Sequence, residues 1–102
     1  MTTRLGWSLA EVADACGGEL IGPADRVIGR VGTDSRDVEA GELFVAVVGE
    51  SFNGHKFAAD ALDSGAAAVV VDGASAVDVA PRIVVGDTLA ALRDLAGKRR
   101  AE

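Results

Sequence analysis

The sequence predicts a three-layer α/β domain, in which a mostly parallel or mixed sheet lies between helices. Two nearly continuous apolar runs, Leu43–Val48 and Ala67–Val71, are typical of strands that are covered on both faces. The segment between them, His55–Ser64, carries apolar residues at helical spacing. A buried strand, a helix and a second buried strand in this order indicate a parallel pair joined by a crossover helix.

Length and composition predict one modest domain. The chain has 102 residues, of which 49% are hydrophobic and only 4% aromatic, so alanine, valine and leucine must fill its interior. The formal net charge of −6 at pH 7 argues against nonspecific binding to nucleic acid or to an anionic membrane. It does not exclude an anionic small molecule, which responds to local donors.

Cysteine usage and hydropathy favour a cytoplasmic protein. Cys16 is the only cysteine, so no disulfide can form within the chain, as fits a reducing compartment. No apolar run approaches the roughly 18 residues that suggest a membrane span. Glu11 and Asp14 interrupt the apolar positions near the N-terminus, which therefore lacks the apolar core of a signal peptide. We expect no membrane insertion.

The first element is a short amphipathic helix, expected over Ser8–Cys16. Ser8 and Glu11 have the spacing of a capping box, and Trp7 precedes the cap as a hydrophobic staple would. Gly17-Gly18 should end the helix, with one glycine in a left-handed conformation. Its apolar face is formed by Leu9, Val12, Ala13 and Cys16.

The remaining elements follow from alternation, apolar runs and turn residues. Asn53 is the expected N-cap of the crossover helix, which ends at Gly65. That helix should place Phe57, Ala58, Ala61 and Leu62 inward and Lys56, Asp60 and Asp63 outward. Further strands are expected at Glu19–Ile21, Val27–Val31 and Arg82–Val85, and a last helix, capped by Asp87, from Thr88 to about Lys98.

Polar residues gather where the predicted strands end. Thr33-Asp34-Ser35-Arg36 follows one strand, and open α/β sheets bind ligands at such strand exits. A plain Asp/Ser turn with a solvated arginine explains the same four residues equally well.

The loop after the most buried strand is the second candidate. Gly49 permits a close approach of backbone to a ligand. Asn53 and Gly54 lie at a helix start, where amide groups and the helix dipole favour an anion by roughly 0.3–1 kcal/mol. His55 follows them, and a lone histidine is more often structural than a ligand-binding residue.

One string carries a resemblance to a known family: TDSR…GELFVAVVGESFNGHKFAADALDSGAAAVVV, from Thr33 to Val71. It resembles the N-terminal domain of the Mur ligases, which build the peptide of bacterial peptidoglycan. The opening WSLAEVADACGGELIG and the closing PRIVVGDTLAALRDLA are most similar to the MurF type, UDP-N-acetylmuramoyl-tripeptide–D-alanyl-D-alanine ligase. The MurE type, which adds the third amino acid, shares much of the pattern and is the alternative. The resemblance covers the chain from about Leu9 to Ala96.

The resemblance implies a site for UDP-N-acetylmuramoyl-peptide. In ligases of this type the segment that matches Thr33–Arg36 helps to bind the UDP end of the substrate. Ser35 can donate its hydroxyl to uracil or a phosphate, Arg36 offers a planar fork for a phosphate or an internal carboxylate, and Asp34 is expected to hold the turn or Arg36. His55 matches an Asp/Asn-Gly-His motif in which many members carry aspartate where this chain has Asn53. The expected substrate-binding residues are Thr33, Ser35, Arg36, Gly49, Asn53, Gly54 and His55.

Three catalytic patterns are absent from the sequence. It contains no Gly-x-x-x-x-Gly-Lys-[Ser/Thr] phosphate loop, no histidine–cysteine cluster with metal spacing and no Gly-x-Ser-x-Gly elbow. In complete Mur ligases the ATP site lies in a central domain, so we expect ATP and Mg in the full-length ligase and no cofactor in this chain, which should form no amide bond alone.

The same resemblance predicts the domain organisation. Residues 1–97 should form the substrate-binding domain, and 98–102 a tail or the start of a linker to central ATP-binding and C-terminal ligase domains. A stand-alone binding or scaffold module of the same fold, without catalysis, is the alternative from another functional class.

Overall fold

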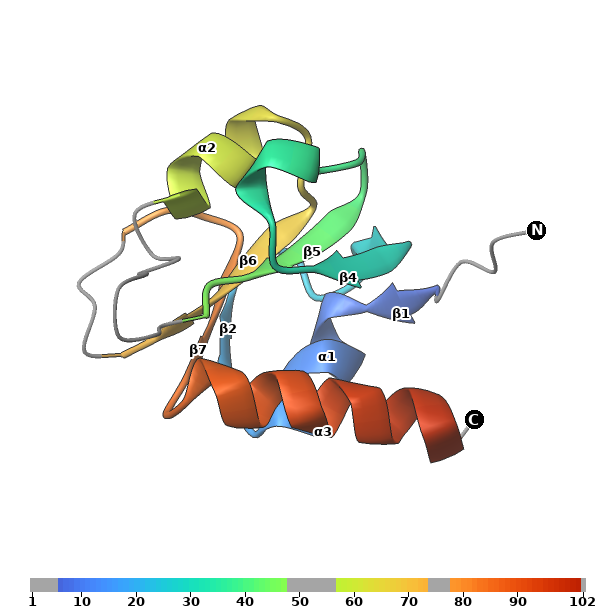
Figure 1. The fold of residues 1–102 in the computed structure, drawn as a ribbon. Coiled ribbons are helices and arrows are strands. Elements are labelled where there is room, and N and C mark those ends of the chain that lie inside the picture. Colours follow the sequence, from blue (N-terminus) through green and yellow to red (C-terminus); the bar gives the residue numbers. More distant parts are fainter. Residues whose placement is uncertain (1–5, 48–56, 74–77, 102) are drawn as a thin grey trace.

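A five-stranded sheet forms the centre of the fold (Figure 1). The computed structural model describes residues 6–47, 57–73 and 78–101, and within these ranges the strand order is β2-β7-β6-β5-β4. The strands are β2 (Glu19–Ile21), β4 (Arg30–Gly32), β5 (Glu42–Val45), β6 (Ala68–Asp72) and β7 (Arg82–Val85). The strands from β4 to β7 are parallel, and β2 is antiparallel to β7 at one edge.

Helices cover both faces of this sheet. α1 (Leu9–Cys16) and α3 (Thr88–Ala101) contact each other on one face, and α2 (Ala58–Asp63) covers the other face. β1 (Trp7–Ser8) and β3 (Val27–Ile28) form a separate antiparallel pair. The predicted three-layer α/β fold with a mixed sheet is therefore confirmed. None of the helices in the described ranges is long and apolar enough to span a membrane.

The capping residues of α1 act as the sequence predicts. Ser8 Oγ accepts a hydrogen bond from the backbone N–H of Glu11 at 3.2 Å, and Glu11 Oε1 accepts one from the backbone N–H of Ser8 at 3.1 Å. Gly17 ends the helix with φ of 65°, a left-handed conformation that glycine adopts without a steric penalty.

Alternate residues of the central strands enter two separate cores. Leu43 and Val45 of β5 pack towards α1 and α3, whereas Phe44 packs towards α2, because successive side chains of a strand point to opposite faces. Phe44 is the largest buried side chain on the α2 face. The other buried residues of that core are small or β-branched: Ala46, Ala58, Ala61, Ala66, Val69 and Val71.

The prediction of one strand over Val27–Val31 is wrong. The chain forms two strands there, β3 and β4, which are separated at Gly29 and belong to different sheets. The backbone N–H of Gly29 donates to the carbonyl of Gly41 at 3.0 Å. The chain therefore passes from the small sheet to the central sheet at Gly29.

Two helices differ in extent from the prediction. α2 begins at Ala58, with Phe57 as its N-cap residue and no side-chain cap, and not at His55; Asn53, the predicted cap, lies outside the described residues. α3 continues to Ala101, so the predicted tail is helical through that residue. Lys98 Nζ lies 5.3 Å from the centre of the Trp7 ring, a cation–π distance that ties the last turns of α3 to β1.

Candidate ligand-binding edge of the sheet

The parallel strands end at one edge of the sheet, where open α/β folds bind ligands. After β4 the chain leaves this edge through Thr33 and Asp34 and forms η1, a 3₁₀-helix over Ser35–Asp37. η1 contacts α2, and both lie on the same face of the sheet (Figure 1). Thr33, Asp34 and Arg36 are exposed, whereas only the backbone of Ser35 is described. The predicted position of this segment at a strand end is confirmed.

Asp34 and Arg36 hold each other in a closed turn. Asp34 Oδ1 accepts from the backbone N–H of Arg36 at 2.9 Å and from Arg36 Nε at 3.1 Å, and Asp34 Oδ2 accepts from Arg36 Nη2 at 3.2 Å. The expected structural role of Asp34 is therefore confirmed. A guanidinium has five N–H donors. Since only two of them point to Asp34, the others remain for an anion from solvent.

Hydrogen bonds from Arg36 lower the pKa of Asp34, the side-chain bonds first and the backbone bond second. The same carboxylate raises the pKa of Arg36. A carboxyl group whose pKa is lower in the folded than in the unfolded chain contributes stability above its unfolded pKa, and loses it as the pH falls through the folded value. The pair is exposed, so this contribution is small. Its main effect is to fix the direction of the arginine.

Replacing Arg36 by alanine should raise the pKa of Asp34 towards the ordinary aspartate value of about 3.9, because the carboxylate loses both hydrogen bonds from the guanidinium and keeps only the one from the backbone N–H. Carboxyl NMR titration measures this change. Arg36→Lys is the matched control, since it keeps the charge without the planar fork and should give an intermediate pKa. An Asp34 pKa that is identical in Arg36→Ala and the parent would show that the pair does not form in solution.

The second predicted loop lies outside the described residues, which leave out 48–56 and with them Gly49, Asn53, Gly54 and His55. The described chain continues past the end of β5 to Val47 and resumes at Phe57, next to α2. β4 and β5 are parallel neighbours, so this loop and the Thr33–Arg36 segment begin at adjacent strand ends. A binding role for these four residues stays a prediction.

α3 begins after β7 at the same edge of the sheet, and the side chain of Asp87 already caps its first turn. Asp87 Oδ1 accepts from the backbone N–H of Leu89 at 2.9 Å and from that of Ala90 at 3.4 Å, which confirms the predicted cap. A carboxylate at this position takes the donors that another anion would need. This helix start is therefore not a second anion site.

The described residues offer donors to a ligand, and they contain no activated thiol. Burial raises the pKa of Cys16 to about 11, with a further contribution from Asp94, so the thiol stays protonated at neutral pH. Within 6–47, 57–73 and 78–101, no group of three or more histidine, cysteine, aspartate and glutamate side chains could hold a metal ion. The described part of this edge offers hydrogen-bond donors and charge to a ligand, and a binding role stays a prediction.

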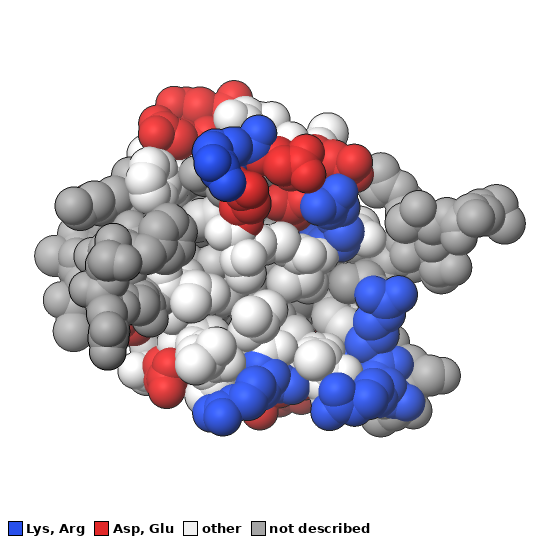
Figure 2. Space-filling view, viewed as in Figure 1, with Lys and Arg blue, Asp and Glu red and all other residues white. Residues whose placement is uncertain are grey.

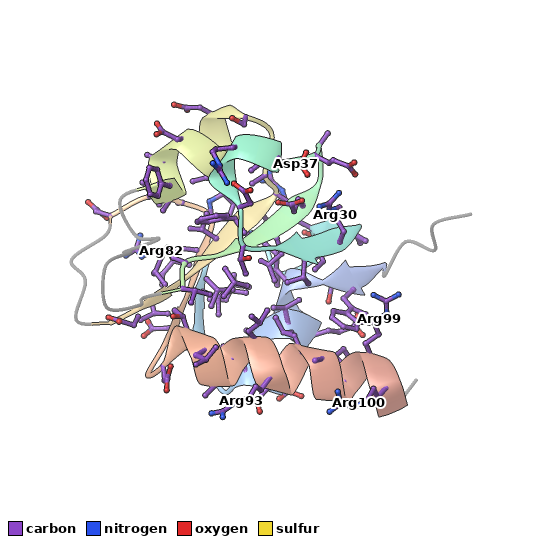
Figure 3. The ribbon with its side chains drawn as sticks, in the orientation of Figure 1. Arg30, Asp37, Arg82, Arg93, Arg99 and Arg100 are labelled. Atoms are coloured by element: carbon purple, nitrogen blue, oxygen red, sulfur yellow. The ribbon has the colours of Figure 1, made fainter. Side chains whose placement is uncertain are left out.

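Sequence reasoning missed one charged pair next to this segment. Glu42 has no exposed surface, and Arg30 Nε lies 2.7 Å from Glu42 Oε1. Acidic and basic side chains adjoin on this face of the molecule (Figure 2), and Arg30 and Asp37 lie on the same side of β4 (Figure 3). The only sequence signal is an acidic residue at the start of an apolar run, and its arginine partner depends on a strand register that one sequence does not reveal.

Comparisons with known proteins extend these observations. The family described as Mur ligase family, catalytic domain, matches residues 27–100. The UDP-N-acetylmuramoyl-tripeptide–D-alanyl-D-alanine ligase of Escherichia coli (strain K12) is 40% identical over 89 residues, which cover 87% of this chain and 19% of that protein. The UDP-N-acetylmuramoyl-L-alanyl-D-glutamate–2,6-diaminopimelate ligase of Listeria monocytogenes is 41% identical over 70 residues, which cover 68% of this chain and 14% of that protein.

A solved structure shows the same fold. A crystal structure of MurF from Acinetobacter baumannii is similar over 97% of this chain and 22% of that chain, with 31% sequence identity and a TM-score of 0.83. This chain spans only about a fifth of the length of the first relatives that it matches.

Proposed function

The chain belongs to the Mur ligase family, and we propose that it is the N-terminal, substrate-binding domain of a MurF-type ligase of bacterial peptidoglycan synthesis. The E. coli relative, which adds D-alanyl-D-alanine, matches 87% of the chain, against 68% for the diaminopimelate-adding relative from Listeria. The crystal structure of MurF from Acinetobacter baumannii is similar over nearly the whole chain. These shares favour the MurF type over the MurE type.

The observation that supports this proposal best is the strand exit over Thr33–Arg36. It presents an exposed arginine whose direction is set by Asp34 and which keeps donors for another anion. A UDP group carries two phosphates, and a guanidinium recognises phosphate with paired hydrogen bonds. We assign Arg36 to the diphosphate and Ser35 to uracil or a phosphate, with Thr33 beside them and Gly49, Asn53, Gly54 and His55 completing the site from the neighbouring strand end.

In the proposed ligase this domain binds and orients the substrate. Holding the UDP end fixes the far end of the peptide, whose carboxylate reacts in the other domains. ATP and Mg would belong to the central domain, since this sequence has no phosphate loop, and no step that involves ATP is assigned to these residues. The division at residue 97, the central and C-terminal domains as partners, and the cytoplasmic location are parts of the same proposal.

Titration with UDP tests the proposed site. The amide NMR signals of Thr33–Asp37 and of Gly49–His55 should shift together as UDP is added, and UDP-N-acetylmuramoyl-peptide should bind more tightly than UDP. Binding of the isolated chain is expected in the millimolar to micromolar range, because the other domains do not enclose the ligand. Shifts confined to residues 72–80, or none at millimolar UDP, would contradict the assignment.

Ser35→Ala is the sharpest single change at the proposed site. Losing a hydrogen bond to a neutral group costs about 0.5–1.5 kcal/mol, and losing one to a charged phosphate about 1.5–3 kcal/mol, so UDP should bind roughly 2- to 150-fold more weakly. The melting temperature should change little. A lower melting temperature with unchanged UDP affinity would instead assign the Ser35 hydroxyl to the turn.

A further inference from the structure

A carboxylate is buried on the face of the sheet that carries η1 and α2. Glu42 is the first residue of β5, has no exposed surface and shares its face with Phe44, two residues along the strand. Arg30 lies opposite it in β4, with Nε at 2.7 Å from Oε1. That contact is close but poorly aligned, and neither carboxylate oxygen has a hydrogen-bond partner among the described residues. Burying a charge with so few partners is unfavourable for folding alone.

The carboxylate of Glu42 fills the place of a missing side chain. A Cβ atom built on Gly32 would lie 2.7 Å from Glu42 Oε2 and 2.8 Å from Glu42 Cδ, which is closer than real Cβ contacts. Side chains in strands lean along the strand direction, so Glu42 reaches from its position opposite Arg30 to the level of Gly32. Gly32 is the last residue of β4 and Thr33 follows it directly. The carboxylate thus packs against the strand exit itself.

The same cluster holds the chain where it returns from η1. Arg30 Nη1 contacts Glu39 Oε1 at 3.1 Å, and the backbone N–H of Glu42 donates to the carbonyl of Glu39 at 3.1 Å. Asp37, at the end of η1, is close enough to interact electrostatically with both Arg30 and Glu42. Arg30 and Glu42 therefore contact the 33–41 segment at both ends: the Glu42 carboxylate packs against Gly32 at its start, and the Arg30 guanidinium and the Glu42 backbone bind Glu39 near its end.

We propose that Glu42 is a positioning residue for substrate binding: its carboxylate, packed against Gly32 and paired with Arg30, sets the path of Thr33–Arg36. That the ligand is UDP rests on the proposed function, whereas the coupling between residues 32 and 42 does not. Residue 32 is small because the carboxylate occupies its side-chain space. A substitution at position 32 or 42 should therefore alter the packing of the other residue.

Variants of the full chain test this coupling without any ligand. Gly32→Ala should shift the amide NMR signals of Thr33–Asp37, because the new methyl group and the carboxylate cannot share the space. In the Glu42→Val background, where the shorter side chain leaves that space open, adding Gly32→Ala should shift these signals much less. Gly86→Ala is the matched control, since its Cβ would meet nothing within 4 Å and its effect should be the same in both backgrounds.

UDP titration of the same variants tests the link to binding. Gly32→Ala should weaken UDP binding about three- to tenfold, within the range of coupling between residues in contact. In the Glu42→Val background it should cause little additional loss. A parent chain that does not bind UDP would refute the proposed function, and the amide signals would still decide whether Glu42 positions the segment.

Two results would overturn the proposal. One is an effect of Gly32→Ala on the Thr33–Asp37 signals that is equal in the parent and in Glu42→Val. The other is a Glu42→Val variant that unfolds more easily but leaves these signals and the UDP affinity unchanged, since Glu42 would then serve stability alone. If Glu42→Val does not fold, Glu42→Ala takes its place in the same comparison.

Discussion

Replacing Arg30 by methionine is expected to lower the free energy of unfolding near neutral pH by more than the loss of an exposed ion pair does. Arg30 is the counterion of a fully buried carboxylate, and methionine keeps the apolar stem of the side chain while removing the charge. Removing one partner of a buried pair leaves the other charge uncompensated, which is among the largest effects of single substitutions. Since Arg30 is 40% exposed, solvent screens part of the interaction, and we place the effect below that of a wholly buried pair.

The loss should depend on pH in a defined direction. Burial raises the pKa of Glu42, and Arg30 opposes this rise, so the pKa should be higher still without the arginine. A carboxyl group with a raised folded-state pKa contributes stability below its unfolded pKa, and loses it as the pH rises through the folded value. The difference between the parent and Arg30→Met should therefore be small below the ordinary glutamate pKa of about 4.3. It should grow as the pH rises through the raised pKa of Glu42 in the parent, and reach its full size above the still higher pKa in the variant.

Urea unfolding across this pH range measures the effect, and Arg82→Met is the matched control. Arg82 also lies on a strand (Figure 3), but its carboxylate partner, Asp78, is 96% exposed, and its other hydrogen bond goes to the neutral carbonyl of Val79, so the cost of its loss should vary little with pH. Equal losses for the two arginine variants would mean that burial of Glu42 has no energetic consequence.

Local signals predicted most of the secondary structure. The capping box at Ser8 and Glu11, the left-handed Gly17 and the Asp87 cap are short-range hydrogen-bond patterns, and each is present. β7 and β2 match their predicted ranges because alternating or apolar runs between turn residues suffice to define them. Within these elements the sequence carries enough information, since the interactions join residues a few positions apart.

The wrong predictions concern interactions between distant residues. The alternation over Val27–Val31 is the same whether the segment forms one strand or two. The structure separates the strands by their partners, since β3 pairs with β1 and β4 with β5, and the bond from Gly29 to Gly41 lies between them. The last helix continues past its expected end near Lys98 to Ala101, and Lys98 lies over the ring of Trp7. Neither contact leaves a signal in the local sequence.

The candidate site was predictable in position but not in detail. Polar residues after β4 indicated the strand exit, and the Asp34–Arg36 turn follows from residues two positions apart. The role inferred for Glu42 depends on the register that places it opposite Arg30 and beside Gly32. Until that register is known, the sequence pattern predicts an exposed glutamate at the start of a strand, not a buried one.

Phe44→Ala should be the most destabilising core substitution under α2, with a loss of about 3–5 kcal/mol in the free energy of unfolding. Phe44 has no exposed surface, and among the described residues its buried neighbours on that face are four alanines and two valines. These side chains are too short to fill the space of the lost ring, and the partly buried Phe57 and Leu62 on the same core can replace only some of its contacts. Thermal unfolding should move down by roughly 12 °C or more, at about 4 °C or more per kcal/mol for a domain of this size.

Leu89→Ala is the control, since Leu89 is 49% exposed on α3 and its truncation should change stability by less than about 0.5 kcal/mol.

The consequence for the candidate site follows from the contact between η1 and α2. If α2 loses its main apolar anchor, η1 loses the surface against which it packs, and Arg36 is no longer presented in one direction. Amide exchange of Phe44→Ala in the folded state should therefore be faster in α2 and Ser35–Asp37 than in α1. Uniformly faster exchange in both helices would show that the two cores unfold only together.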